Sequence, residues 1–326
     1  MSYILGIDQG GTKTFAAITD TEGNILSCHR SAGSFMVESG VPTAVYYMME
    51  AAKVALDSAG LKAEDISSVV AGVKGINWPG DDIMVKNELA KHFTASDITA
   101  CNYSVIAYYS GTVSDTGAVL CAGTGINAAL FSGGNCFILG DYLRSSLQGA
   151  TALSVRAIEA VFQSEIGALP ETALTELFLD FAGEKSIDAL LKRFMCDEEF
   201  LEKIKGLTPK IKKLSDEGDE VALDLMTAFA GEVTACFIGA LKKKNMVGLD
   251  RDIVLTGSVF GRTDGLTAMI ADNIKKTAVN ANIVYAVYEP IIGACLLGII
   301  KDTGFVSKDT EQRVRVSTEK FNLLRI

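Results

Sequence analysis

One motif occurs twice in this chain of 326 residues, and it limits the possible folds more than any other feature. The first copy runs from Ile4 to Ile18 around Asp8-Gln9-Gly10-Gly11-Thr12, and the second runs from Ala118 to Phe131 around Ala122-Gly123-Thr124-Gly125. Each copy predicts two strands joined by a tight turn, then a glycine turn and a third strand. Glycine lets backbone N–H groups come close to an anion. Two such hairpins predict two halves that face one polyphosphate, which indicates nucleotide chemistry.

The composition narrows the class of protein. Apolar residues make up 48% of the chain, so we expect a well-packed globular protein that is long enough for two domains. The net charge of -10 argues against nucleic acid as a partner, because its phosphates attract a basic surface. The start of the chain does not resemble a signal peptide, and the longest apolar stretch, Pro290 to Ile300, is too short for a membrane span. We therefore expect a cytoplasmic protein that binds neither membrane nor nucleic acid.

The cysteines and histidines argue against a zinc site. The 2 histidines, His29 and His92, are too few for a typical one. The cysteines are scattered singly without a Cys-x-x-Cys pair, which favours buried free thiols. The 7 cysteines are Cys28, Cys101, Cys121, Cys136, Cys196, Cys236 and Cys295.

Hydrophobic spacing predicts alternating strands and helices after an initial three-strand meander over residues 2–31. Further strands are expected over residues 66–73, 97–102, 252–255 and 282–286. Helices are expected over residues 42–59, 81–93, 104–110, 147–167, 170–190 with a break near Gly183, 197–214, 219–245, 266–278 and 290–300. No low-complexity linker separates the halves, so we expect two abutting domains with a hinge near residues 111–116.

Five segments resemble, in order, the actin, sugar-kinase and heat-shock-chaperone superfamily. Within it the chain is similar to the BadF/BadG/BcrA/BcrD ATPase family, which includes N-acetylglucosamine kinases. The matching segments are residues 6–14, 71–76, 122–125, 255–260 and 290–294. The resemblance implies an α/β fold of two ribonuclease H-like (actin/hexokinase-type) domains, each with a mixed sheet flanked by helices, and a nucleotide in the cleft between them.

The resemblance also implies a division of labour between the domains. Residues 1–113 would form the first phosphate and acceptor domain, with helix 290–301 packing back onto it. Residues 114–289 would form the second phosphate and adenosine domain. The tail after Thr303 has no counterpart in the resemblance.

The nucleotide would be ATP with Mg²⁺. Asp8 would bind the metal, since a hard cation prefers oxygen ligands. One hairpin would cradle the β- and γ-phosphates, the second hairpin would close on them, and a later loop would border the adenosine. These three groups are Gly10, Gly11, Thr12, Lys13 and Thr14; then Gly123, Thr124 and Gly125; then Gly257 and Ser258.

The acceptor, a small molecule such as an amino sugar, would bind at the loop after the strand 66–73. Trp78 in this loop could stack on a sugar or could serve only packing. The residues implied at the acceptor are Gly72, Lys74, Gly75, Asn77, Trp78 and Asn102.

The chain departs from the family pattern on the acceptor side. Sugar kinases of this family carry an aspartate that accepts the proton of the sugar hydroxyl, and Tyr103 occupies that position here. The family's Gly-Asp-Glu-Gly-Ser motif maps either to residues 140–144 or to residues 146–150, and its Asp-Glu pair is intact in neither. Tyrosine has an ordinary pKa of about 10 and is a poor base at neutral pH. Asp141 or another carboxylate is the candidate catalytic base.

Three functions remain open from the sequence. The first is an ATP-dependent kinase of an amino sugar or related small molecule, similar to N-acetylglucosamine kinase, with a degraded acceptor site. The second is a nucleotide-binding sensor or regulator with little transfer activity. The third is an ATPase activator of a 2-hydroxyacyl-CoA dehydratase, suggested by Cys121 beside the second hairpin. A homodimer is compatible with each.

Overall fold

A five-stranded sheet forms around the first glycine hairpin. The computed structural model describes residues 2–93, 97–261 and 263–325, and in it this sheet has the order β3-β2-β1-β4-β5. β1 pairs antiparallel with β2 and parallel with β4, and β4 pairs parallel with β5. The carboxyl ends of β1, β4 and β5 therefore lie at one edge of the sheet. The strands are β1 (Tyr3–Gln9), β2 (Lys13–Asp20), β3 (Ile25–Ala32), β4 (Ile66–Val73) and β5 (Asp97–Asn102).

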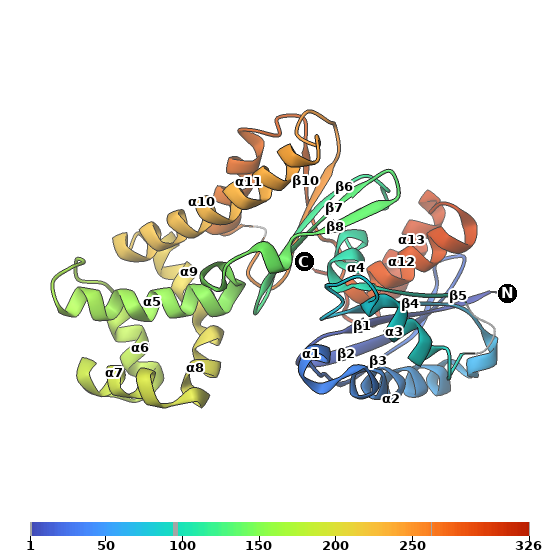
Figure 1. The fold of residues 1–326 in the computed structure, drawn as a ribbon, viewed down its shortest axis with the longest axis horizontal. Coiled ribbons are helices and arrows are strands. Elements are labelled where there is room, and N and C mark those ends of the chain that lie inside the picture. The colour runs from blue at the N-terminus through green and yellow to red at the C-terminus, as the bar shows by residue number, and fades with distance from the viewer. Residues whose placement is uncertain (1, 94–96, 262, 326) are drawn as a thin grey trace. The chain divides into compact units, whose positions relative to one another are not determined.

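Alternate residues of the central strands enter two different apolar clusters, because side chains along a strand point to opposite faces. Leu5 and Ile7 pack in the cluster that holds the buried face of α2, whereas Ile4 packs in the cluster that holds α12. The two helices cover opposite faces of the sheet (Figure 1). Each fully buried aliphatic side chain of this kind contributes about 1.5–3 kcal/mol. The helices that follow these strands are α1 (Met36–Ser39), α2 (Val41–Ala59), α3 (Asp81–Leu89), α4 (Tyr103–Tyr109), α12 (Pro290–Thr303) and α13 (Lys308–Glu319).

The second glycine hairpin lies in another five-stranded sheet, with the order β10-β9-β6-β7-β8. Its strands are β6 (Gly117–Ala122), β7 (Ile126–Ser132), β8 (Asn135–Ile138), β9 (Asp252–Thr256) and β10 (Asn282–Tyr285). Among the described residues, seven α-helices lie between β8 and β10: α5 (Gly149–Glu165), α6 (Leu174–Ala182), α7 (Ile187–Cys196), α8 (Glu198–Ile204), α9 (Thr208–Asp216), α10 (Glu220–Lys243) and α11 (Gly265–Lys275).

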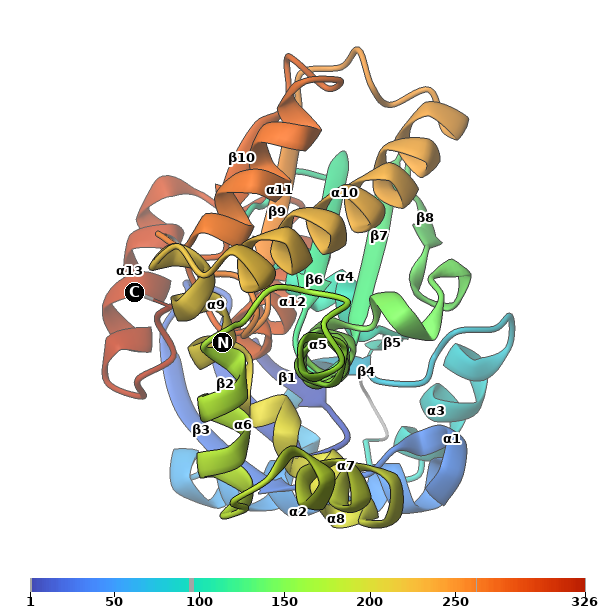
Figure 2. The same ribbon diagram turned by 90° about the vertical axis from the view of Figure 1, so that its left-hand side faces the viewer.

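α10 is the one helix among the described residues that is long and apolar enough to cross a membrane. Its mean hydropathy is 1.6, and 44% of that apolar window is buried within the protein. The criterion rests on length and composition alone, which the core helix of a water-soluble protein also meets. α10 packs against α5, α9 and α11 (Figure 2).

The chain divides into two compact units. The first unit comprises Met1–Val119, Ala129–Ile138 and Val284–Ile326, and the second comprises Leu120–Ala128 and Leu139–Ile283. The first glycine hairpin belongs to the first unit and the second hairpin belongs to the second unit. The assignment of separate phosphate, acceptor and adenosine roles to two domains stays a prediction.

Two expectations from the sequence need correction. The thiols are not all buried: Cys136, Cys196 and Cys236 are exposed, because each lies at a strand edge, helix end or outer helix face. The tail after Thr303, for which the sequence suggested no role, contains the helix α13.

Candidate active site

The turn between β1 and β2 has the form expected of an anion-binding hairpin. The Gly10 N–H donates to the Lys13 carbonyl at 2.9 Å and closes the turn. Gly11 and Thr12 at its tip are exposed, while Thr14 is buried and its hydroxyl has no hydrogen-bond partner within the described part of the chain. The tip therefore offers backbone N–H groups and a threonine hydroxyl to a ligand.

Asp8, the predicted metal ligand, lies two residues before Gly10 and is partly buried. Desolvation raises the pKa of its carboxyl to about 7, against a smaller lowering by Lys13, and the nearby charge of Glu289 raises it further. A partly buried carboxylate that lacks sufficient positive charge is a common feature of functional sites. A divalent cation would supply that charge, and carboxylate oxygen is the kind of ligand that Mg²⁺ prefers. Asp8 therefore fits the predicted role.

Residues outside the first hairpin pack against its turn and support it, and the sequence analysis did not identify them. A Cβ on Gly33 would lie 2.4 Å from both the Gly10 carbonyl oxygen and the Lys13 nitrogen, so only glycine fits there. The Ser34 N–H donates to the Gly10 carbonyl at 3.1 Å, and the buried Gln9 amide donates to Ser34 Oγ at 3.2 Å. The only signal in the sequence is a single glycine directly after β3, which is too common to have been singled out.

Lys74, predicted at the acceptor, lies beside the phosphate hairpin. Its backbone N–H donates to the Gln9 carbonyl at 2.9 Å. A Cβ built on Gly11 would lie 3.5 Å from Lys74 Nζ, and that ammonium also lies 4.8 Å from the centre of the Phe35 ring. The position of this ammonium favours contact with a phosphate bound at the hairpin.

Asn102 holds the loop that follows β4. Its side-chain amide donates to the Ile76 carbonyl at 2.8 Å and to Asn77 Oδ1 at 2.9 Å. Its Oδ1 accepts from the Ser104 N–H at 3.0 Å, which caps α4. Since Asn102 is 3% exposed and both of its amide hydrogens are used within the chain, it orders the loop that was predicted to bind the acceptor.

Asp81 orders the other end of this loop. Its Oδ2 accepts the N–H groups of Asn77 at 3.0 Å and of Trp78 at 2.9 Å. The Trp78 side chain is 67% exposed, so packing in a core does not explain it, and stacking on a sugar stays a prediction. Gly75 has φ +112 and makes the turn, while Gly72 gives room to α4.

The second hairpin packs against the start of α5. Gly149 has φ +52, and a Cβ there would lie 2.4 Å from the carbonyl oxygens of both Gly123 and Gly125. The Ala150 N–H donates to the Gly123 carbonyl at 2.8 Å. The Thr151 hydroxyl donates to the Thr124 carbonyl at 3.0 Å. These bonds fix the carbonyl side of the turn, and Gly149 is a second support residue that the sequence analysis missed.

The loop after β9 meets this hairpin. Gly257 has φ +103, and a Cβ there would lie 2.2 Å from the Ala122 carbonyl oxygen. The Val259 N–H donates to that same carbonyl at 2.9 Å, and a Cβ on Gly123 would lie 3.8 Å from Ser258 Oγ. Gly257 and Ser258 therefore lie beside the second hairpin, as an adenosine or phosphate site would need.

Strand register in the first sheet brings together the predicted site residues that follow β1, β4 and β5. Asp8 pairs with Gly72, and Gly72 pairs with Cys101. The hairpin after β1, the loop after β4 and Tyr103 at the start of α4 consequently share one edge of the sheet. Asp141, the candidate base, lies exposed in a short turn of the second unit. No group of three or more His, Cys, Asp or Glu side chains within the described ranges could hold a metal ion, so a cation would take most of its ligands from phosphate and water.

A family model covers almost the whole of this arrangement. The BadF/BadG/BcrA/BcrD ATPase family matches residues 5–298, from the first strand into α12. The chain belongs to the BadF/BadG/BcrA/BcrD ATPase family. The resemblance noted in the sequence is thereby confirmed, and α13 lies beyond the matched region.

Two relatives of this chain are sugar kinases by name. N-acetyl-D-glucosamine kinase of Dictyostelium discoideum is 26% identical over 317 residues, which covers 90% of this chain and 97% of the relative. A glucosamine kinase of Vibrio cholerae is 26% identical over 265 residues, which covers 80% of this chain and 86% of the relative.

Solved structures confirm the predicted fold class of this chain. A ROK hexokinase from Thermus thermophilus superposes with TM-score 0.61 at 17% identity, covering 93% of this chain and 99% of the other. A ROK glucokinase from Streptomyces griseus, in complex with glucose and AMPPNP, superposes with TM-score 0.57 at 18% identity, covering 91% and 99%. Such distant likeness establishes the two-domain actin-like fold alone.

Proposed function

We propose that this protein is an ATP-dependent kinase of an amino sugar or a related small molecule. The observation that carries the proposal is the strand register that brings the Asp8 hairpin, the Asn102-ordered loop and the start of α4 to one edge of the sheet. A phosphate-binding turn beside a loop for a small acceptor is the arrangement that phosphoryl transfer needs. The amino-sugar kinases among the relatives support the choice of acceptor class.

In this proposal each group has a definite role. Gly11, Thr12 and Thr14 hold the terminal phosphates through backbone N–H and hydroxyl groups. Gly10 closes the turn that presents them, and Lys13 and Lys74 supply positive charge. Gly123, Thr124 and Gly125 of the second hairpin bind the same triphosphate, and Gly257 and Ser258 border the nucleoside. Asp8 holds Mg²⁺, directly or through water; when bound, the ion neutralises charge that develops on the transferred phosphoryl group.

The acceptor side of the proposed site lacks the catalytic base that the family pattern leads us to expect. Tyr103 stands where a carboxylate base is expected, and Asp141 is the candidate replacement. A general base contributes ~10²–10⁴-fold to such a reaction, so a kinase without one would still turn over slowly. We therefore expect transfer to N-acetylglucosamine to fall well below the ~1–100 s⁻¹ typical of kinases.

An assay of ADP release with N-acetylglucosamine, glucosamine and other amino sugars tests the proposal. Acceptor-dependent ADP release that is lost in Asp8→Ala, with the variant still folded, supports a kinase. A rate of ~1–100 s⁻¹ with N-acetylglucosamine would show that another carboxylate serves as base. Asp141→Asn identifies that carboxylate if it removes the rate. If no acceptor stimulates ADP release although Mg–ATP binds, the kinase proposal is wrong.

A nucleotide sensor is the second candidate, and Tyr103 is the observation that favours it. Without a base the nucleotide could be bound and released with little transfer, so that binding itself becomes the signal. Binding of Mg–ATP without acceptor-dependent turnover distinguishes this outcome in the same assay.

The activator of a 2-hydroxyacyl-CoA dehydratase was suggested by Cys121 alone. This side chain is buried, with 7% of its surface exposed. A cytoplasmic location and a homodimer remain parts of the proposal without a specific observation.

A further inference from the structure

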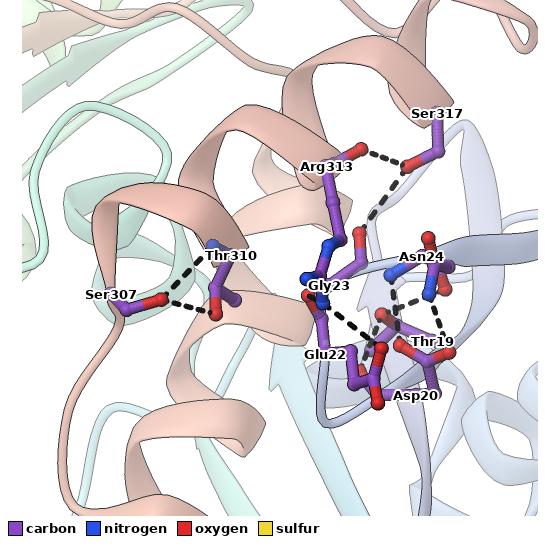
Figure 3. Close-up of polar contacts among 9 residues, drawn as sticks. All are labelled: Thr19, Asp20, Glu22, Gly23, Asn24, Ser307, Thr310, Arg313 and Ser317. Atoms are coloured by element: carbon purple, nitrogen blue, oxygen red, sulfur yellow. Dashed lines mark hydrogen bonds and ion pairs between the residues drawn. The ribbon is translucent and has the colours of Figure 1, made fainter.

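The C-terminal helix α13 docks on the outer turn of the first sheet (Figure 3). Arg313 pairs with Glu22 at 2.9 Å, and Ser317 Oγ accepts a hydrogen bond from the Ile25 N–H at 3.0 Å. Val314 on the same face is fully buried. The tail is therefore an integral part of the first unit, although it lies beyond the region that the family shares.

The residues after α13 pair with the segment that enters α12. The Glu289 N–H donates to the Leu323 carbonyl at 2.9 Å, and the Arg325 N–H donates to the Val287 carbonyl at 2.8 Å. The residues between these two pairs form an antiparallel bridge. The tail thus holds the backbone of Glu289 from one side.

The side chains of this pairing also meet. Arg325 Nε lies 3.7 Å from Glu289 Oε1, and the side chains are 22% and 32% exposed, respectively. The guanidinium therefore limits where the carboxylate can point. The sequence analysis did not identify Glu289. Its only signal in the sequence is that it directly precedes the proline at the start of α12.

The packing of α12 on β1 places Glu289 near the phosphate hairpin. A Cβ on Gly298 would lie 2.4 Å from the Ile4 side chain, and a Cβ on Gly6 would lie 2.9 Å from Cys295 Sγ. As β1 advances from Ile4 to Gly6, about 6.6 Å, the facing part of α12 moves back from Gly298 to Cys295, three residues or about 4.5 Å. The helix therefore runs antiparallel to β1, and its amino end lies beside Asp8.

We propose that Arg325 positions the Glu289 carboxylate beside Asp8, so that both carboxylates face the divalent cation of the bound nucleotide. Arg325 acts through Glu289 and does not touch the cation. The inference rests on the proposed nucleotide and Mg²⁺ site. It agrees with the electrostatic influence of Glu289 on Asp8, although the packing and the hydrogen bonds carry the argument.

The test measures binding of Mn²⁺, in the presence of a non-hydrolysable ATP analogue, to the full-length protein by electron paramagnetic resonance. Arg325→Ala should weaken Mn²⁺ binding about tenfold, the lower end of the loss seen when a group that orients a metal ligand is removed. Arg325→Lys should restore most of it. Thermal unfolding should change little, since a partly exposed ion pair contributes little stability.

Two controls separate positioning from a structural role. Arg313→Ala breaks the other ion pair of the tail, on Glu22, and should leave Mn²⁺ affinity unchanged. In a Glu289→Gln background, Arg325→Ala should have no further effect on Mn²⁺ affinity. A loss of affinity equal in both backgrounds, or an equal loss in Arg313→Ala, would overturn the proposal.

The outcome also distinguishes this inference from the proposed function. If the wild-type protein binds Mn²⁺ with the analogue and Asp8→Ala does not, the nucleotide site stands. Unchanged affinity in both Arg325→Ala and Glu289→Gln then refutes the positioning role alone. If the wild-type protein binds no Mn²⁺ with the analogue, both proposals fail.

Discussion

At the scale of single residues, Asp8 shows a conflict between burial and charge. Its carboxyl has a pKa of about 7 because desolvation outweighs the attraction of Lys13. Such a group costs stability when it ionises, and a ligand that restores positive charge recovers that cost. Such a raised pKa is expected of a residue that binds a ligand and does not stabilise the fold.

Asp8→Asn should therefore stabilise the free protein at high pH while it weakens Mg²⁺ binding. The native pKa lies above the unfolded value of 3.8, so the native state binds more protons between these values and the wild type loses stability as pH rises through this window. The variant should gain increasingly over that range, up to about 4 kcal/mol at pH 8, since one pKa unit corresponds to about 1.4 kcal/mol. Urea unfolding at pH 4 to 8 measures the difference. The exposed Asp57→Asn should stay within about 0.5 kcal/mol of wild type throughout. Equal pH dependence in wild type and Asp8→Asn would contradict the raised pKa.

The same pKa predicts how cation binding depends on pH. Mg²⁺ requires the ionised carboxylate, so protons compete with the metal below pH 7. Apparent Mg²⁺ affinity with the ATP analogue should rise up to about tenfold per pH unit towards pH 7 and level off above it. Calorimetry in a pH series measures this, after subtraction of the same series for the nucleotide and metal without protein. A flat profile between pH 5.5 and 7 would remove Asp8 as a metal ligand.

At the scale of elements, each hairpin depends on a distant glycine that gives its turn room. Gly33 lies against the first turn and Gly149 against the second, with would-be Cβ contacts of 2.4 Å to backbone atoms. Backbone atoms cannot move aside as the end of a flexible side chain can. The loop geometry is thus fixed by packing from outside the motif.

Gly149→Ala should distort the second hairpin. The substitution combines a left-handed φ of +52 with clashes against two carbonyl oxygens, and we expect a loss of about 3 kcal/mol or more together with weaker nucleotide binding. Gly167→Ala is the matched control, because its φ is +76 but nothing lies within 4 Å, so only about 1 kcal/mol should be lost and binding kept. Chemical unfolding and nucleotide titration of both variants give the comparison. Similar losses in the two would mean that the contact with the hairpin is unimportant.

The elements themselves were largely predictable, because their signals are local. The strands predicted over residues 66–73 and 97–102 match β4 and β5 to the residue. The break predicted near Gly183 is confirmed, since α6 ends there and α7 begins at Ile187 and runs to Cys196. The predicted helix 197–214 is likewise interrupted, between Ile204 and Thr208.

The candidate site was predictable only in part, since much of it depends on tertiary contacts. The two hairpins can be recognised in the sequence from their glycine and threonine residues. Gly33, Gly149 and Glu289 cannot, because their roles come from residues more than twenty positions away in the chain. Lys74 was assigned to the acceptor loop by its neighbours in sequence, yet its ammonium lies beside Gly11.

At the scale of the whole molecule, the two glycine hairpins belong to different compact units. The chain passes between the units after residues 119, 128, 138 and 283. Neither unit alone carries both hairpins. If one triphosphate binds both, the units must come together around it, and the connecting segments are where backbone angles would change.

Binding of Mg–ATP should therefore make the protein more compact. The radius of gyration should approach the value for a closed chain of 326 residues, about 20 Å by the usual scaling with length. Small-angle scattering with and without a non-hydrolysable analogue measures the change, and Asp8→Ala at the same analogue concentration should stay near the free value because it binds Mg²⁺ poorly. Calorimetry on the same samples establishes occupancy. An unchanged radius with the site demonstrably filled would count against closure of the two units on the nucleotide.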